Sequence, residues 1–337
     1  MADRSRIQWT EATWNPIGGC TRVDEGCRNC YAEVMAARFS QPGQWGEGLA
    51  RMVKGADGRT DHRWTGKMLL HEAALDRPLR WRRPRLIFVN STSDLFHESV
   101  PDDWIDQAFA VMALCPQHTF QVLTKRPERA GRYLSADWSS RARVWVETMT
   151  LPTISKAAGD AQDRLRRYTA PGFPAPLPNV WLGTSISDQA SADARIPELL
   201  ACPAAVRFLS AEPLLGPASL EPWLHTPPCY LYRGLRAQPN ECTCATTFGP
   251  RLAWVICGGE SGPGARPMHP DWARSLRDQC VAAGVPFFFK QWGEFRPPVT
   301  DDETRAVRDG KGIGGSLMLD GTFGNPRGGA VLRVGKK

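Results

Sequence analysis

Short apolar runs recur along the chain, and each ends abruptly in polar or glycine residues before a stretch with helical spacing. The runs are rich in β-branched and aromatic residues, which is typical of strands buried on both faces of a sheet. The intervals between them can hold the helix that joins two parallel strands in a βαβ unit. The runs are RLIFVN ending at Asn90, TFQVLT ending at Thr124, NVWLG ending at Gly183, AVRFLS ending at Ser210, LAWVIC ending at Cys257 and VPFFFK ending at Lys290.

Helical spacing of apolar residues follows the cysteine-rich start of the chain and recurs between the runs. The apolar sets are Ala32, Met35, Ala36 and Phe39, then Ile105, Ala108, Phe109 and Met112, and finally Trp272, Leu276 and Cys280. Pro101-Asp102 supplies a start for the second helix, and Gly284 supplies a stop for the third. With a first strand or turn before Cys20, the chain contains six or seven β/α units. We therefore predict an α/β fold with a parallel sheet, as a partial or full TIM-like barrel.

The predicted barrel spans residues 1–295 and carries two insertions. Residues 151–178 end in the proline-rich PGFPAPLP, a stiff connection, and residues 221–251 contain clustered cysteines. Residues 296–337 are rich in Gly, Asp and Arg and lack periodicity. We interpret them as a glycine-rich C-terminal extension.

Composition narrows the class of protein. With 337 residues, 42% hydrophobic and 23% charged, the chain has globular composition. It contains no apolar run of about 18 residues, and its start, MADRSRIQWTEATW, has no apolar segment. We therefore expect no membrane association, no secretory signal and a cytoplasmic location. Ten cysteines in such a chain favour metal ligands or redox groups over disulfides.

The net charge of +7 favours anionic partners, nucleic acid among them, although a basic enzyme without such a partner has the same charge. The substrate and the oligomeric state stay open at this level.

Polar residues follow every predicted strand. In a parallel barrel the carboxyl ends of the strands meet at one mouth, where active sites lie. Ordinary loop polarity is the alternative explanation, but six polar ends in succession favour a site. The ends are Asn90 to Asp94, Thr124 to Arg126, Gly183 to Ser185, Ser210 to Glu212, Gly258 to Ser261 and Lys290 to Glu294.

Cys20, Cys27 and Cys30 form a C-x6-C-x2-C pattern in a glycine-rich loop just before a predicted helix. Three thiolates can hold three irons of a [4Fe–4S] cluster and leave the fourth iron open to a small molecule. The helix N-terminus would favour an anionic cluster. Two alternatives remain: zinc held by these cysteines with His62 or His71 as a further ligand, or thiols without a metal.

A second group of potential ligands lies in the 221–251 insertion, with the spacing H-x3-C-x12-C-x-C. Four nitrogen and sulfur ligands on a short segment with little apolar content fit structural zinc, and a loop with reduced thiols is the alternative. The residues are His225, Cys229, Cys242 and Cys244.

The chain resembles the phage-associated three-Cys-motif protein family, which is similar to radical S-adenosylmethionine enzymes. The resemblance runs from about Ile7 to Phe295, and its motifs are IQWTEATWNPIGGC…GCRNCYAE, LTKRPER, NVWLGTSISDQ, FLSAEPLLG, WVICGGESGPGARPM and FFFKQWGEF. Two features depart from the usual radical-enzyme pattern. The first cysteine gap has six residues instead of three, and Asn29 stands where an aromatic residue usually precedes the third cysteine.

The resemblance implies a barrel that holds a site-differentiated [4Fe–4S] cluster, with S-adenosylmethionine bound to the free iron through its amino and carboxylate groups. It also implies an external electron donor, and reductive cleavage to a 5′-deoxyadenosyl radical that abstracts hydrogen from a substrate.

Roles at the barrel mouth follow from side-chain chemistry. We expect the cations Lys125 and Lys290 to take part in catalysis, by holding the cofactor carboxylate or substrate phosphates. We expect the cofactor on Thr184, Ser185, Ser210, Glu212, Gly258, Gly259 and Glu260. We expect the substrate on Trp14, Asn15, Asn90, Arg126, Arg266 and Trp292, with Phe295 as a further stacking candidate. Tight turns, surface charge and packing are the alternative roles.

Two functions therefore compete. The first is a radical enzyme with an iron–sulfur cluster and S-adenosylmethionine, acting on a nucleic acid, a nucleotide or another substrate. The second is a zinc-containing nucleic-acid-binding protein without catalysis, suggested by the charge, the 13 tryptophans and the cysteine-rich insertion. The many polar strand ends favour the enzyme, because binding alone does not require them.

Overall fold

The computed structural model describes residues 5, 7–54, 58, 60–137, 140–141, 144, 176–224, 251–296 and 307–308. Most of both predicted insertions and of the predicted extension lies outside these residues. The second group of potential ligands, His225, Cys229, Cys242 and Cys244, also lies outside them.

The fold is α/β with a seven-stranded sheet in the order β1-β6-β7-β8-β9-β10-β11, the arrangement of a partial TIM-like barrel. The pairs β1–β6, β6–β7, β9–β10 and β10–β11 are parallel. All six predicted runs form strands of this sheet, and a strand before Cys20 is the seventh, which confirms the predicted fold class. The strands are β1 (Ala12–Trp14), β6 (Leu86–Val89), β7 (Thr119–Thr124), β8 (Val180–Ile186), β9 (Val206–Ala211), β10 (Trp254–Gly258) and β11 (Phe287–Gln291).

The chain divides into two compact units, and the division falls within β8. The first unit comprises Met1–Gly183 and Cys202–Val206, and the second comprises Thr184–Ala201 and Arg207–Lys337. Each unit has its own helices and its own candidate site.

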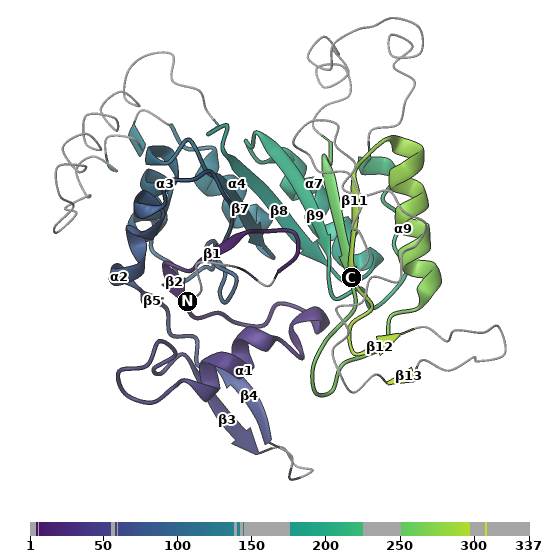
Figure 1. The fold of residues 1–337 in the computed structure, drawn as a ribbon, viewed down its shortest axis with the longest axis horizontal. Coiled ribbons are helices and arrows are strands. Elements are labelled where there is room, and N and C mark those ends of the chain that lie inside the picture. Colours follow the sequence, from purple (N-terminus) through teal and green to yellow (C-terminus); the bar gives the residue numbers. More distant parts are fainter. Residues whose placement is uncertain are drawn as a thin grey trace, which may run out of the picture. The chain divides into compact units, whose positions relative to one another are not determined.

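The first unit adds helices and short antiparallel pairs to its strands. Its helices are α1 (Tyr31–Arg38), α2 (Glu72–Leu75), α3 (Asp102–Leu114) and α4 (Pro127–Leu134), with 3-10 turns at Glu25–Cys27 and Arg77–Arg80. Its antiparallel pairs are β2 (Ile17–Gly18) with β5 (Leu69–Leu70), and β3 (Ala50–Lys54) with β4 (Thr60–Trp64). The ribbon formed by β3 and β4 packs on α1 and was not predicted (Figure 1).

Helix α3 carries the apolar face that its spacing predicts. All four predicted positions are buried, and Phe109 packs against Tyr133 and Phe96, with ring centroids 5.4 and 6.4 Å away. The buried carboxylate of Asp106 accepts a hydrogen bond of 2.6 Å from the Tyr133 hydroxyl. This polar contact lets the α3 face close on α4 without an unpaired buried hydroxyl.

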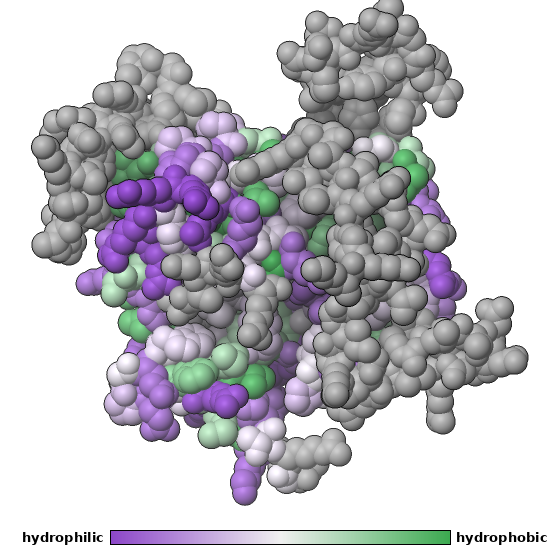
Figure 2. All heavy atoms as spheres, in the orientation of Figure 1, coloured by the Kyte–Doolittle hydropathy of each residue, from purple (hydrophilic) through white to green (hydrophobic). Residues whose placement is uncertain are grey.

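Helix α1 forms where predicted, but its buried face differs from the predicted one. Met35 is 38% exposed and Phe39 follows the end of the helix, whereas the buried residues are Ala32, Glu33, Ala36 and Ala37. Figure 2 shows hydrophobic residues at the surface over α1 and the ribbon. The face rotates because the carboxylate of Glu33 finds partners inside the unit, and a buried carboxylate requires them.

The second unit contains α7 (Gln189–Ala201), α9 (Pro270–Ala283), a 3-10 turn at Glu221–Trp223 and the pair β12 (Phe295–Arg296) with β13 (Val307–Arg308). Helix α9 packs on β10 and β11 (Figure 1). Leu276 and Cys280 are buried as predicted, and Gly284 ends the helix with a φ of 68°. In the described part of the chain, no helix has the length and apolar character to cross a membrane.

Replacement of Phe109 by alanine should lower the free energy of unfolding by about 3 to 5 kcal/mol, because it removes a fully buried ring and leaves a cavity. Denaturant unfolding followed by circular dichroism measures this change. The matched control Asp103→Ala, at an exposed position of the same helix, should change stability by less than about 0.5 kcal/mol. Equal effects of the two substitutions would contradict the assigned core.

Candidate functional site

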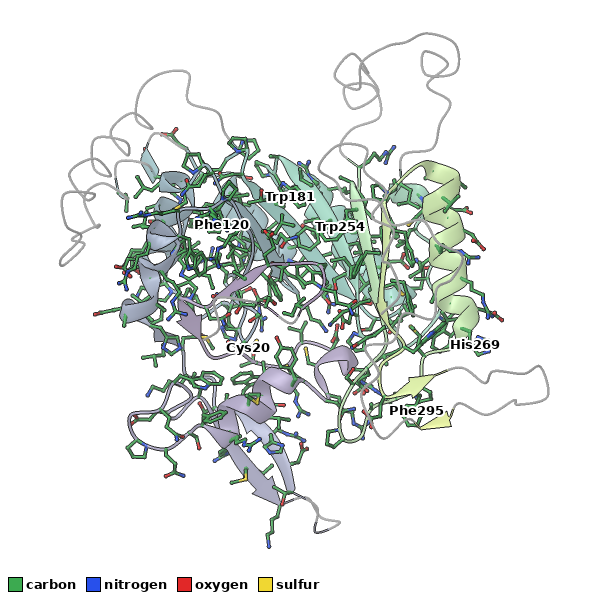
Figure 3. All side chains as sticks on the ribbon, in the orientation of Figure 1. Cys20, Phe120, Trp181, Trp254, His269 and Phe295 are labelled. Atoms are coloured by element: carbon green, nitrogen blue, oxygen red, sulfur yellow. The ribbon has the colours of Figure 1, made fainter. Side chains whose placement is uncertain are left out.

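The three predicted cluster ligands lie on one loop of the first unit. Cys20 follows β2 (Figure 3). Cys27 ends a 3-10 turn, and Cys30 is the residue before α1. All three are free thiols with intermediate exposure. The loop therefore offers three sulfur donors that are neither oxidised to disulfides nor sealed in the core.

The electrostatics of the loop link the three thiols. Burial raises the pKa of Cys20 to about 12; Asp94 adds to this rise, Arg126 opposes it, and Cys30 and Cys27 add smaller increases. Thiols that influence each other in this way lie in one electrostatic neighbourhood. A metal that binds them must release their protons, so a cationic centre is the natural partner of this group.

Burial also raises the pKa of Cys30, while the backbone N–H groups of Glu33 and Ala32 lower it. These N–H groups belong to the first turn of α1, where the helix leaves donors unpaired. The N-terminus of α1 therefore supports negative charge on the Cys30 sulfur.

Among the described residues, no three His, Cys, Asp or Glu side chains lie close enough together to hold a metal ion. Neither His62 nor His71 therefore completes a zinc site with the cysteines there. Zinc requires its sulfur ligands about 3.8 Å apart, from tetrahedral geometry and a Zn–S distance of about 2.3 Å. A cubane cluster binds each cysteine to a different iron and so tolerates a wider separation. In donor chemistry, three free thiols suit a thiolate-bound cluster.

Asp94, at the polar end that follows β6, is the hub beside this loop and is only 5% exposed. Its Oδ1 accepts hydrogen bonds from the Thr124 hydroxyl at 2.7 Å and from the Phe96 N–H at 3.0 Å. Its Oδ2 accepts from the Lys125 N–H at 3.1 Å. The predicted polar ends of β6 and β7 thus meet, and the sequence analysis did not single out Asp94 as their link.

Arg126 connects this hub to the cysteine loop. Its Nη1 donates to Asp94 Oδ2 at 2.9 Å, and its Nη2 donates to the Thr21 hydroxyl at 2.9 Å and the Thr21 carbonyl at 3.2 Å. Thr21 directly follows Cys20. A guanidinium predicted to bind substrate is therefore paired with a buried carboxylate and holds the first cysteine in place.

His97 completes the network from the other side of Thr21. Its Nδ1 accepts the Ser99 N–H at 3.0 Å, so Nε2 carries the proton and donates to the Thr21 hydroxyl at 2.8 Å. Burial lowers the pKa of His97, and the nearby Arg126 lowers it further. His97 is thus a neutral donor that fixes the loop, and its sequence position gave no signal of this role.

Lys125 also joins the loop. Its Nζ lies 2.7 Å from Asp24 Oδ1, and both side chains are largely covered. Asp24 lies in the six-residue gap between Cys20 and Cys27. Lys125, predicted to be catalytic, therefore anchors the segment between Cys20 and Cys27 to the end of β7.

Glu33 binds Arg22, a second residue of the same six-residue gap. The carboxylate is 1% exposed, and its Oε2 accepts from Arg22 Nε at 2.9 Å and Nη2 at 2.5 Å. Its Oε1 accepts the Trp64 N–H at 2.7 Å, and Arg22 also donates to the His62 carbonyl. This arrangement, called here the Glu33 clasp, joins the loop, α1 and the ribbon.

An open depression of about 650 Å³ lies beside the Glu33 clasp, and some of its lining residues are close to Cys27 in the sequence. It is lined by Arg22, Val23, Asp24, Glu25, Arg28 and Arg63. Its charges are of both signs, so it offers no clear preference for an anionic ligand.

The predicted aromatic and amide ligands of the first unit lie in its interior. The Trp14 ring has no exposed surface, donates to the Ala74 carbonyl at 2.8 Å and packs against Phe120. Asn15 accepts the Ser91 hydroxyl at 3.1 Å. Trp14 contributes packing in this structure, and a substrate has no access to its ring.

Asn90 directly follows β6 and is 2% exposed, with a φ of 54°. Its Oδ1 accepts the Ile17 N–H at 3.5 Å, a long contact to the strand that precedes Cys20. Asparagine tolerates this left-handed backbone better than most residues, so its position serves the turn. The predicted contact of Asn90 with substrate stays a prediction.

In the second unit, Lys290 and Glu212 form an ion pair across the end of β10. The pair passes directly over Gly258, where a Cβ atom would lie 3.3 Å from the Glu212 carboxyl carbon. Glu212 follows β9 and Lys290 lies on β11, the two neighbours of β10. The ends of β9, β10 and β11 therefore form one charged group, and the absence of a side chain at Gly258 leaves room for it.

The adjacent loop is closed by Glu260 and Arg266. Glu260 is 6% exposed and accepts from Arg266 Nη2 at 2.7 Å, from Nε at 2.9 Å and from its backbone N–H at 2.9 Å. A Cβ atom on Gly259 would lie 1.9 Å from the Trp292 carbonyl oxygen. The structure places these two predicted ligands against each other, as a brace for the glycine-rich turn.

The remaining predicted cofactor residues are buried hydroxyls near the same strand ends. Thr184, Ser185 and Ser210 are 0%, 6% and 2% exposed, and the Ser185 hydroxyl donates to the Glu212 carbonyl at 3.0 Å. Trp292 is 8% exposed and packs on Phe289. The Ser185 hydroxyl thus supports the backbone of Glu212, and the Trp292 ring lies against Phe289.

The Glu33 clasp should contribute strongly to stability. Glu33→Gln should lower the free energy of unfolding by about 2 kcal/mol, because the partly exposed guanidinium of Arg22 loses a buried carboxylate partner. A double-mutant cycle with Arg22→Met should give a coupling of about 1 kcal/mol or more. In the control Arg28→Met, the broken pair with Glu25 spans 3.7 Å between exposed side chains, so the change should stay below about 0.5 kcal/mol. Additive effects of Glu33 and Arg22 would refute the clasp.

The two neighbouring glycines should respond differently to a methyl group. Gly259→Ala should lower the free energy of unfolding by at least about 2 kcal/mol, because the added carbon collides with rigid backbone. Gly258→Ala should cost less than about 1 kcal/mol, because the end of the Glu212 side chain can move. Denaturant unfolding of both variants measures the difference, and the reverse order would contradict the geometry.

A protein-family model described as "Protein of unknown function (DUF5131)" matches residues 4–323. No curated protein and no solved structure matches the chain. The matched range contains the three cysteines and all the strand ends described above, so both candidate sites belong to the region that defines the family.

Proposed function

The chain belongs to the DUF5131 family, and we propose that it is a radical S-adenosylmethionine enzyme with a [4Fe–4S] cluster on Cys20, Cys27 and Cys30. One observation carries the proposal: three free thiols share a loop that buried polar groups fix to the strand ends of a partial barrel. A loop built only as a surface turn would not need these buried charges.

The cluster, once bound, would supply one electron that cleaves S-adenosylmethionine and yields a 5′-deoxyadenosyl radical able to abstract hydrogen from the substrate. The chain's own residues would prepare the loop for this. Arg126 and Lys125 hold Thr21 and Asp24 to the end of β7, and Glu33 on α1 holds Arg22 between them. The helix N-terminus beside Cys30 would favour the negative charge of a thiolate-bound centre.

The second unit offers groups suited to an amino-acid cofactor. Within this unit, Lys290 can bind an anionic group and Glu212 can accept hydrogen bonds from a ligand, once their mutual pair opens. The hydroxyls of Thr184, Ser185 and Ser210 remain our proposed cofactor contacts, as do Gly258 and Gly259 through close backbone approach. Glu260 and Arg266 are better assigned to the brace, because each already satisfies the other.

The reaction needs an external electron donor, and the net charge of +7 makes a nucleic acid or nucleotide our choice of substrate. Arg126 is not our choice for binding it, because its guanidinium is engaged by Asp94 and Thr21. Zinc on the ligands of residues 225–250 stays a proposal for the insertion.

Anaerobic purification with metal and sulfide analysis tests the proposal. The protein should be brown and contain iron and sulfide, and reduction with S-adenosylmethionine should release 5′-deoxyadenosine. Serine in place of Cys20, Cys27 or Cys30 should abolish iron retention and deoxyadenosine release, since each ligand holds its own iron.

Cys202→Ser is the matched control, because Cys202 is a buried thiol that donates to the Pro127 carbonyl at 3.3 Å, and serine can keep that bond. It should retain wild-type iron. Colourless protein with stoichiometric zinc at the loop and salt-sensitive nucleic-acid binding would instead establish the non-catalytic alternative. Deoxyadenosine release by Cys27→Ser would also refute the proposed ligands.

A further inference from the structure

Two opposite charges lie next to Thr21, the residue after Cys20, and the proposed function uses them only to hold the loop. Asp94 and Arg126 are 2.9 Å apart, and their side chains are only 7% and 11% exposed. Charges with so little water around them act on their neighbours more strongly than surface charges do. Arg126 donates two hydrogen bonds to Thr21, and the Cys20 thiol donates to the same Thr21 carbonyl at 3.4 Å.

The two charges must act on a centre at Cys20 in opposite directions, because one is a cation and the other an anion. Both lie within one hydrogen-bonded chain that runs from Asp94 through Arg126 to the Thr21 carbonyl beside the Cys20 thiol. The other partners of Asp94 are uncharged donors, namely the Thr124 hydroxyl and the N–H groups of Phe96 and Lys125. The carboxylate therefore stays hydrogen-bonded when the guanidinium is removed, and its charge can be studied separately.

We propose that Asp94 and Arg126 form a charge pair that sets the reduction potential of the cluster on Cys20, with Arg126 raising it and Asp94 lowering it. The inference rests on the proposed function, since it requires the cluster. Reduction transfers one electron from an external donor to the cluster, with no bond made or broken. The added negative charge is stabilised by a nearby cation and destabilised by a nearby anion.

Substitution of each charge in turn distinguishes an electrostatic effect on the potential from structural support of the loop. If Arg126 only positioned Thr21, its loss would disturb the loop, and neutralising Asp94 would disturb it in the same sense. An electrostatic effect depends on the sign of the charge that is removed, so the two single substitutions must shift the reduction potential in opposite directions. The double substitution must largely cancel, because the net charge is restored.

The experiment is an anaerobic redox titration with dithionite and mediators, followed by the electron paramagnetic resonance signal of the reduced cluster. The variants are Arg126→Gln, Arg126→Lys, Asp94→Asn and the double variant Asp94→Asn/Arg126→Gln. At one fixed potential near the wild-type midpoint, Arg126→Gln should lower the ratio of reduced to oxidised cluster roughly tenfold. Asp94→Asn should raise it, while Arg126→Lys and the double variant should stay near wild type.

Arg132→Gln is the matched control, because it removes one positive charge from α4 at a side chain that is 54% exposed and pairs with Glu128 and Glu98. It should leave the midpoint unchanged. Iron and sulfide analysis of every variant checks that the cluster is present. If Arg126→Gln loses iron, the upward shift of Asp94→Asn and the unchanged midpoint of Arg126→Lys still decide the question.

Failure of the proposed function and failure of this inference give different results. Wild-type protein without iron and sulfide would overturn the proposed function and this inference with it. Wild-type protein with a cluster whose midpoint is unchanged by Arg126→Gln and Asp94→Asn would overturn the inference alone. Shifts of the same sign in both single variants would also overturn it, and would assign the pair to support.

Discussion

The buried carboxylate of Asp94 is the constraint on which the candidate centre depends. A carboxylate with so little water must be hydrogen-bonded or paired, and Asp94 is both. Its partners come from the ends of two neighbouring strands and, through Arg126, from the loop that contains Cys20. One charge therefore ties the cysteine loop to the sheet. Without it, a glycine-rich loop would have little to hold its three sulfurs in a common neighbourhood.

The long first gap of the cysteine pattern has a structural explanation. A six-residue gap gives the chain more freedom than a three-residue gap, and freedom of this kind costs conformational entropy when the loop is ordered. Two ion pairs offset that cost: Lys125 holds Asp24, and Glu33 holds Arg22. The ribbon of β3 and β4 belongs to the same solution, because its backbone satisfies the rest of the clasp.

The second unit shows how glycine determines what a strand end can do. At Gly258 the absence of a side chain lets Glu212 reach Lys290 across the intervening strand. At Gly259 it lets two backbone segments touch, which fixes the turn braced by Glu260 and Arg266. The Glu212 carboxylate is 20% exposed against 5% for Glu260, so the first pair is the better candidate for opening to a ligand.

The sequence alone determined the strands, α3, α9 and the cysteine pattern, because each is encoded in neighbouring residues. Local period and turn residues suffice for a run such as TFQVLT or for Gly284 at the end of α9. The inward turn of Glu33, the ribbon and the Asp94 hub were decided only by tertiary structure. Arg126 lies 105 residues from Thr21 and 32 from Asp94, so no local pattern could reveal that these charges satisfy one another. A buried charge requires a partner, and only the folded chain determines which partner lies within reach.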